Sequence, residues 1–586
     1  MLPPDARTVL TDVLRPPPGT ILDRAVALTY SVDLESALVV PLAFAGQVLR
    51  ESGDPVAVME AVRGCADRVD VFCQAGQITV PRRGADLLAF LEPVVHPVRR
   101  PRPGHLFHSK LWALRFRTET SDVGYARLLI LSRNLTDDRT SWDVCLRLDG
   151  VIGKVAVPIN EPVANLIERT LELCVMPVDE ERRRGIQALV DDLRRVDWER
   201  PEGVRELAFH ALGVPGESRP DFNGTRHLAV APFCNDKGLD ITVPNRGGTI
   251  VSCQDDLDRL SDGALDGVSV FVINELAGIP SEEAGQGQSV LTGLHAKLYV
   301  VESGHTARVL LGSANATDAA FGGNVEILAE LTGTKSNLGI DAMLSVDRGF
   351  GAILEPYDRG VPKEEDPDDL TLADLVRDLA AVPLTATVER ADDALAIRLS
   401  SQLPLPATAE GFRVTAELVT RPGEAVTLVA GAPVDGVFSG LAVVDVTPFV
   451  VITASDRRGE KLSTVVCAQL VGDPAGRFDE VIARQVDPPE KFLRFLALLL
   501  GLAGDANAVL GEGSGNGTWV TKGGPGILEL LLRGLVDRPA QLDDLSRLVE
   551  RLNSTEQGRT VLPDGFAELW QIIDAVRREL ASEGAS

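Results

Sequence analysis

One short polar pattern occurs twice in this chain of 586 residues, and it constrains the fold more than any other feature. The first copy consists of His108 and Lys110, then Ser132 and Asn134, then Asp143. The second copy consists of His295 and Lys297, then Ser313 and Asn315, then Glu326. The histidine and the asparagine are 26 residues apart in the first copy and 20 apart in the second, which places the extra residues in the polar stretch 117–125. Two copies of one arrangement predict two related halves whose sites face one cleft.

Apolar runs frame both copies of the pattern. In the second copy, Leu298–Val301 and Val309–Leu311 are separated by turn residues, which predicts a β-hairpin. A strand alternates its faces, so residues two positions apart, such as His295 and Lys297, are expected on the same face. A hairpin in the right register would gather an imidazole, an ammonium, a hydroxyl and an amide on one face. That combination suits an oxyanion or phosphate site.

At these residues the chain resembles the phospholipase D superfamily, whose mark is His-x-Lys followed by Ser/Thr-x-Asn and an acidic residue, usually twice. The first copy, with Leu135 and Trp142 nearby, is most similar to the tyrosyl-DNA phosphodiesterase branch, whereas the copy that begins at His295 resembles the general bacterial form. The resemblance covers roughly residues 30 to 350. Many members have an aspartate five residues after the lysine, where this chain has Arg115 and Glu302. The tyrosyl-DNA phosphodiesterase branch also lacks that aspartate.

The resemblance implies phosphodiester cleavage in two displacements through a phosphohistidine. Neutral imidazole is a competent nucleophile, and a second imidazole can donate and accept a proton near neutral pH. We place the nucleophile at His108 and the acid at His295, with the reverse assignment left open. The lysines and asparagines would neutralise and hydrogen-bond the phosphate oxygens, with help from both serines, while Asp143 and Glu326 would each hold a ring nitrogen. Because lysine supplies the positive charge, we expect no metal and no cofactor.

A net charge of −27 opposes a nucleic-acid substrate at first sight. Exposed charges farther apart than ~8–10 Å are screened, however, so the local distribution matters more than the sum. Six arginines lie upstream of His108 or inside the first motif and are candidates for substrate binding: Arg82, Arg83, Arg99, Arg100, Arg102 and Arg133. They could form a basic rim that guides a polyanion, or simply a solvated loop.

The predicted fold class is α/β with mixed sheets, because strands and helices alternate in both halves. We expect a first half over 1–175, a helical connector over 176–210 containing a helix at 179–196, and a second half over 211–362. Short alternating strands over 370–480 predict a β-sandwich, and 486–586 predicts a helical domain whose last helix spans 566–580. The composition of residues 278–287 predicts a flexible loop near the site. The glycine-dense run 511–517 lacks the Gly-Lys-Ser/Thr of a P-loop and is interpreted as a connector.

The seven cysteines are odd in number and show no Cys-x-x-Cys spacing, which favours reduced thiols over a disulfide or zinc framework. No secretory signal is visible at the start, and the most apolar run, 495–500, is far shorter than the ~20 residues that span a bilayer. We therefore expect a cytoplasmic protein that does not bind membranes, with an undetermined oligomeric state.

These observations together favour a metal-independent phosphodiesterase, most simply a nuclease for DNA or RNA. A role in a bacterial defence or DNA-processing system, with a helicase or ATPase bound by the C-terminal domains, is an expectation from the resemblance. Two alternatives stay open: a phospholipase or phosphatidyltransferase, and an inactive scaffold that binds nucleic acid.

Overall fold

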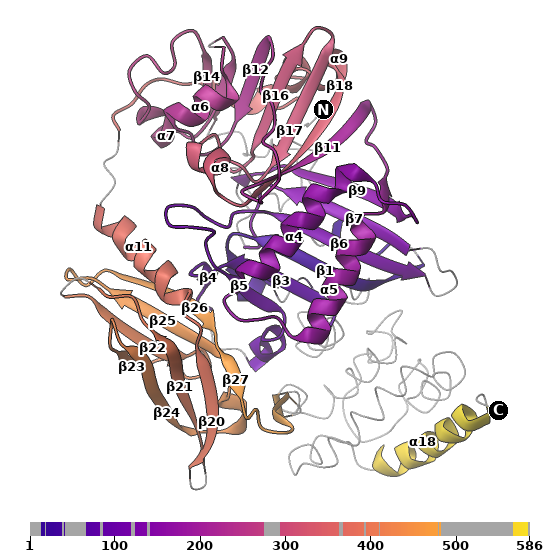
Figure 1. Ribbon diagram of the computed structural model, residues 1–586, viewed down its shortest axis with the longest axis vertical. Helices are drawn as coiled ribbons and strands as arrows, with labels where there is room; N and C mark the ends of the chain where they lie inside the picture. The colour runs from indigo at the N-terminus through magenta and orange to yellow at the C-terminus, as the bar shows by residue number, and fades with distance from the viewer. Residues whose placement is uncertain are drawn as a thin grey trace, which may run out of the picture.

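The computed structural model describes residues 13–17, 19–37, 40, 66–81, 86–118, 124–136, 141–245, 247–274, 293–347, 349–362, 367–391, 394–408, 411–478, 480–481 and 566–583. Within these ranges the chain is a mixed α/β protein with two large sheets, two four-stranded sheets and two two-stranded sheets (Figure 1). The predicted α/β class is confirmed. Most of the predicted helical region 486–586, and the stretches 278–287 and 511–517, lie outside the described residues. The helix predicted over 566–580 is observed as α18 (Phe566–Glu583).

The first large sheet contains seven strands. In spatial order they are β10 (Val196–Trp198), β9 (Cys145–Ile152), β7 (Gly124–Leu131), β6 (Leu111–Thr118), β1 (Thr20–Thr29), β3 (Val69–Gln74) and β5 (Val95–Val98). β1, β3 and β5 are parallel, whereas β1, β6, β7 and β9 form an antiparallel meander. β6 ends at Thr118 and β7 begins at Gly124, both within the stretch 117–125 where the sequence places the extra residues of the first copy.

The second large sheet repeats this order. It runs β11 (Val204–Leu212), β18 (Glu326–Thr334), β17 (Thr306–Gly312), β16 (Leu298–Ser303), β12 (Arg226–Val230), β13 (Thr249–Val251), β14 (Ser269–Ile273) and β19 (Leu354–Pro356). Here β12, β13 and β14 are parallel, and β12, β16, β17 and β18 are antiparallel. The predicted hairpin is therefore β16–β17. The two sheets share one topology, as the duplicated sequence pattern requires.

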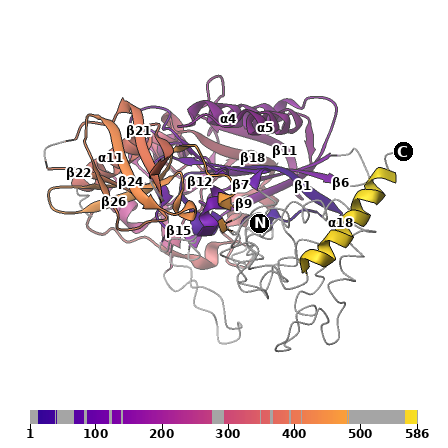
Figure 2. The same ribbon diagram turned by 90° about the horizontal axis from the view of Figure 1, so that it is seen from below.

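One hydrophobic core joins the two sheets. It contains Val26 and Leu128 from the first sheet and Phe209 and Val300 from the second, all at most 4% exposed. Two helices complete it, α4 (Glu161–Leu173) and α5 (Glu180–Leu193), which lie side by side along the first sheet in both views (Figure 1, Figure 2). α5 packs on β1, and α4 packs on β11. The segment predicted as a connector thus takes part in the core.

Short helices link the strands of the second half. They are α6 (Asp236–Thr242), α7 (Gln254–Asp258), α8 (Asp318–Gly322), α9 (Lys335–Leu338) and α10 (Ile340–Met343). Asn235 begins α6 by accepting a hydrogen bond from the Gly238 amide, and Thr317 begins α8 in the same way through the Ala320 amide. α6 and α8 contact each other.

The region after residue 366 begins with α11 (Pro367–Ala380) and continues as two four-stranded sheets. One sheet contains β24 (Pro433–Leu441), β21 (Ala394–Pro404), β20 (Thr385–Ala391) and β27 (Gln469–Val471). The other contains β23 (Val426–Leu428), β22 (Arg413–Leu418), β25 (Phe449–Ser455) and β26 (Lys461–Cys467). β25 and β26 contribute Phe449 and Val465 to a core shared with the first sheet, so this region is fixed to the first half.

Candidate active site

The two histidine motifs lie where strands end, not within a strand as the hairpin pattern predicted. β16 begins at Leu298, just after Lys297, and β17 ends at Gly312, just before Ser313. Gly312 has a φ of 154°, and a Cβ there would lie 2.2 Å from the Ile327 carbonyl oxygen. Only glycine fits this turn, which directs the following serine toward Glu326. The polar groups are therefore gathered at one edge of each sheet.

The two halves exchange backbone hydrogen bonds at these edges. The His108 amide donates to the Val325 carbonyl at 2.9 Å, immediately before Glu326. In the matching place, the His295 amide donates to the Trp142 carbonyl at 2.9 Å, immediately before Asp143. The exchange at His295 is extended by a short parallel pair, β15 (Gly293–Leu294) with β8 (Ser141–Trp142). Each histidine is thus aligned with the acidic residue of the opposite half.

The side chains pair in the same crossed manner. His108 Nδ1 lies 3.0 Å from both carboxylate oxygens of Glu326, and His295 Nδ1 lies 3.1 Å from Asp143 Oδ1. An acceptor at Nδ1 holds the proton on that nitrogen and leaves the Nε2 lone pair available. We call the two contacts His108–Glu326 and His295–Asp143 the crossed pairs. They give both imidazoles the tautomer that a nucleophile or a proton acceptor needs.

Each serine holds the acid of its own motif. Ser313 Oγ donates to Glu326 Oε2 at 2.5 Å, and Ser132 Oγ donates to Asp143 Oδ1 at 3.0 Å. Both hydroxyls also accept a backbone amide hydrogen bond, at 2.9 Å. The serines were expected to help bind phosphate, but these contacts commit their hydroxyl groups to orienting the carboxylates. Asn324 Nδ2 also donates to Glu326, at 3.2 Å.

Both lysines are fully buried beside the histidines. Lys110 Nζ lies 2.9 Å from His108 Nε2 and donates to the His108 carbonyl at 3.0 Å. Lys297 Nζ donates to the His295 carbonyl at 2.8 Å. Burial, with the repulsion of Lys297, holds the pKa of Lys110 well below its usual value, and burial lowers the pKa of Lys297 to about 8. The charges of the two lysines repel each other, so a bound anion would favour the ammonium form of both.

The histidines share this electrostatic environment. Burial, aided by the charges of Lys110 and Lys297, lowers the pKa of His108 to about 4 although Glu326 opposes the shift. Burial also lowers the pKa of His295, where Asp143 opposes the shift and both lysines add to it. Burial alone would raise the pKa of Glu326, but His108 and Lys110 outweigh it, so that pKa lies below its usual value. Neutral imidazoles beside an ionised carboxylate are the expected state near pH 7.

The two asparagines carry uncommitted amide groups. Asn134 Oδ1 and Asn315 Oδ1 are buried and have no hydrogen-bond partner within the described residues. Buried polar atoms are almost always paired, so two unpaired amides at equivalent positions of the two motifs call for a ligand. A half-turn of either amide would present its NH2 group in place of the oxygen.

Tyr30, which the sequence pattern did not single out, forms part of the site. Its ring packs edge-on against His108, with centroids 5.0 Å apart, and lies 5.8 Å from Lys110 Nζ. Tyr30 is the residue after β1, so its position at the sheet edge could have been inferred from the strand pattern. Its neighbour Arg377 on α11, whose Nη2 pairs with Asp374 at 2.8 Å, comes from the region beyond the two halves. No local pattern indicates that contact.

The arginines expected to bind substrate have different surroundings. Arg99 donates to the carbonyls of Cys174, Val175 and Ala381, and Arg100 pairs with Asp374 and Asp378 of α11. These contacts fasten α11 to the first half, so the structure gives both arginines a structural role in place of the predicted rim. Arg102 donates to the Gly322 carbonyl at 2.8 Å, and Arg133 donates to the Thr136 carbonyl at 3.2 Å. Arg82 and Arg83 lie outside the described residues.

Arg115 and Glu302, five residues after the two motif lysines, also make structural contacts. Arg115 pairs with Asp23 and Asp192, and Glu302, 1% exposed, pairs with Arg226 and Lys335. Glu302 also accepts a hydrogen bond from the Ile340 amide at 2.9 Å. Neither side chain contacts a motif histidine in these pairings, so the departure leaves the crossed pairs intact.

Comparison with known proteins adds little to this geometry. No protein-family model matches the chain, and no curated protein matches it at a significant level. Among solved structures, polyphosphate kinase from Porphyromonas gingivalis aligns with a TM-score of 0.28 and 11% identity, over 55% of this chain and 42% of that one. The chain therefore spans less than half the length of that structure, and no functional conclusion follows from so distant a match. Among the described helices, none combines the length and apolar character needed to cross a bilayer.

Proposed function

We propose that this chain is a phosphodiesterase that cleaves nucleic acid through a phosphohistidine. The observation that carries the proposal is the crossed pairs, which hold two imidazoles in a reactive tautomer beside two buried lysines. Neighbouring cations and the resemblance of the first motif to tyrosyl-DNA phosphodiesterases favour a nucleic-acid substrate over a lipid.

In the first step, His108 Nε2 attacks phosphorus, forming a P–N bond while the bond to the leaving oxygen breaks. The phosphate anion favours uptake of a proton by His295 as substrate binds, and His295 then gives that proton to the leaving oxygen. Before substrate binds, Lys110 donates a hydrogen bond to His108 Nε2 at 2.9 Å. This bond must break, because the Nε2 lone pair is the one that attacks phosphorus. An anionic phosphate oxygen is the better acceptor for an ammonium, so substrate binding itself would draw Lys110 away.

In the second step, His295 removes a proton from water as the water oxygen attacks phosphorus. The P–N bond breaks, His108 leaves neutral, and His295 is again protonated. His295 Nε2 forms no hydrogen bond within the described residues, which suits a group that exchanges protons with substrate and water. The amides of Asn134 and Asn315 and the two ammonium groups would stabilise the phosphate oxygens as charge builds.

The test is cleavage of fluorescently labelled single- and double-stranded DNA and RNA in EDTA, beside phosphatidylcholine, by the parent protein and by His108→Ala and His295→Ala. His305→Ala, an exposed histidine outside both motifs, is the matched control. We expect nucleotide release by the parent and the control and loss of release in both motif variants. An alkali-stable, acid-labile phosphoprotein trapped in His295→Ala would assign His108 as the nucleophile. Choline release without nucleotide release would refute the nuclease.

A further inference from the structure

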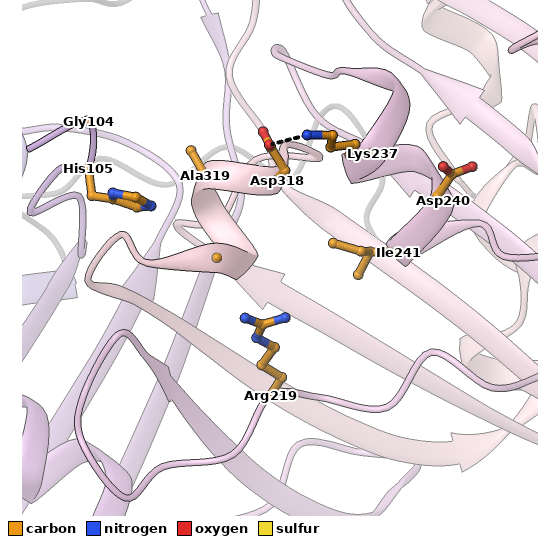
Figure 3. Close-up of a pocket in the computed structure, with 9 residues that line it drawn as sticks. Gly104, His105, Arg219, Lys237, Asp240, Ile241, Asp318 and Ala319 are labelled. Atoms are coloured by element: carbon orange, nitrogen blue, oxygen red, sulfur yellow. Dashed lines mark ion pairs between the residues drawn. The ribbon is translucent and has the colours of Figure 1, made fainter.

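A pocket of about 650 Å³, a size typical of ligand sites, is lined by residues of both halves. Gly104 and His105 of the first half form one wall, and Arg219, α6 and α8 of the second half form the others (Figure 3). His105 is three residues from His108, so their α-carbons are at most ~11 Å apart. Successive nucleotides of one B-form strand rise ~3.4 Å, so this pocket lies within about three nucleotides of a phosphate at His108.

Cationic groups converge on this pocket. Figure 3 shows the Arg219 guanidinium directed toward its middle, and the exposed Arg219 side chain has no ion pair or hydrogen bond within the described residues. Lys237 of α6 stands across from it, only loosely paired with Asp318 at 3.8 Å. Arg102, outside the lining itself, donates to the Gly322 carbonyl and contacts His105. An anion entering here would meet at least one uncommitted guanidinium.

The pocket also offers a free acceptor and an apolar surface. The carboxylate of Asp240 on α6 is exposed and makes no pairing within the described part of the chain, whereas Asp318 already accepts from Asn235 at 2.8 Å. Ile241 and Ala319 supply the apolar part of the lining. An isolated phosphate would be repelled by Asp240, whereas a nucleotide has both a phosphate and a base with amino donors.

We propose that this pocket is a subsite for a nucleotide that flanks the scissile phosphate in a single strand. Arg219, with Lys237, binds the backbone phosphate, and the Asp240 carboxylate accepts a hydrogen bond from an exocyclic amino group of the base. Cytosine carries such a donor at N4, and thymine carries a carbonyl at the same position. This inference rests on the proposed function and adds a strand path and a base preference to it.

The test is binding of fluorescein-labelled dC12 and dT12 to the full-length His108→Ala protein in EDTA, over a series of salt concentrations. We expect dC12 to bind about fivefold tighter than dT12 or more. Arg219→Gln should weaken both and lower the slope of log K against log salt by ~0.7, the value of one phosphate contact on a single strand. Asp240→Asn should bring the two affinities together, because an amide can both accept and donate.

Two further variants make the outcome decisive. Gly322→Leu should weaken both oligonucleotides, because a Cβ at this pocket residue points into open space and meets no atom within 4 Å. Arg205→Gln is the charge-matched control, since Arg205 is exposed at the far end of β11. If Arg219→Gln behaves like Arg205→Gln while the parent still cleaves nucleic acid, the subsite is wrong and the function stands. If the parent neither binds nor cleaves any nucleic acid, both proposals fall.

Discussion

Replacing Glu326 with glutamine tests whether a crossed pair both orients the site and stabilises the fold. The Glu326 side chain is 0% exposed and accepts from His108 Nδ1, Asn324 Nδ2 and Ser313 Oγ. A glutamine keeps the shape but removes the charge that compensates the buried Lys110. Removing one partner of a buried ion pair typically costs about 3–5 kcal/mol. We expect the free energy of unfolding to fall by about that amount.

The same change should affect activity through the histidine tautomer. The glutamine NH2 can donate to His108 Nδ1, which would move the ring proton to Nε2 and remove the attacking lone pair. Wrong-tautomer substitutions of this kind lower kcat by roughly 10⁴-fold. Guanidinium unfolding at pH 7 and initial cleavage rates measure the two effects separately.

A double variant shows whether the uncompensated lysine causes the loss of stability. Adding Lys110→Met to Glu326→Gln should recover about 1–3 kcal/mol relative to the sum of the single variants. A loss below about 1 kcal/mol in Glu326→Gln, with additive behaviour in the double variant, would refute the reasoning. Lys110→Met alone serves as the control for packing.

Three more predictions concern the pH dependence of catalysis, the arginines that bind α11 and the environment of His108. His108 must be neutral and His295 protonated, so kcat/KM should rise as the pH passes about 4 and fall as His295 loses its proton, at a pH below that of an ordinary imidazole. The fall should steepen above pH 8, where Lys297 loses its charge, and Lys297→Arg should remove only that second step. Arg99→Gln should lower the free energy of unfolding by about 1.5–3 kcal/mol, and Arg100→Gln, at a more exposed ion pair, by about 0–1 kcal/mol. Nucleic-acid affinity should stay unchanged in both variants, and weaker binding without a loss of stability would contradict this prediction. Tyr30→Ala should let water reach the imidazole and raise the pKa of His108 toward 6.5, whereas Tyr30→Phe should not, as measured by NMR titration of ¹³C-labelled histidine.

The alternation of strand and helix patterns was sufficient to predict the α/β class, and the apolar runs around the second motif predicted the β16–β17 hairpin, because both depend on local periodicity. The duplicated polar pattern identified the residues that the structure brings together at the sheet edges. The crossing of the pairs was not predictable, because His108 and Glu326 are 218 positions apart and either acid could have reached either ring. That choice depends on how the two sheets dock through their shared core.

The partners of Arg99 and Arg100 were likewise not predictable from the sequence. Arg99 and Arg100 stand among prolines before the motif, a context that fits an exposed basic rim as well as a structural tie. Their partners on and after α11 are about 280 residues away, as the Arg100–Asp378 separation of 278 shows. Charge spacing along the chain indicates how many cations are present, but only the fold determines which of them remain unpaired.

The crossed pairs are symmetric in topology and unequal in detail, which suggests how the two histidines divide the work. The His108 side chain is 11% exposed, with its Nδ1 held by both carboxylate oxygens, whereas the His295 side chain is 24% exposed and held by one oxygen. A buried, strongly oriented and neutral ring suits a nucleophile that must form and break a bond to phosphorus. A more accessible ring with an uncommitted Nε2 suits the group that exchanges protons with the leaving oxygen and with water. Asp143→Glu should therefore lower the rate of the second step more than the rate of the first, so phosphoenzyme would accumulate during turnover. If instead no phosphoenzyme builds up and the initial burst of product is lost, the roles of the two histidines are reversed.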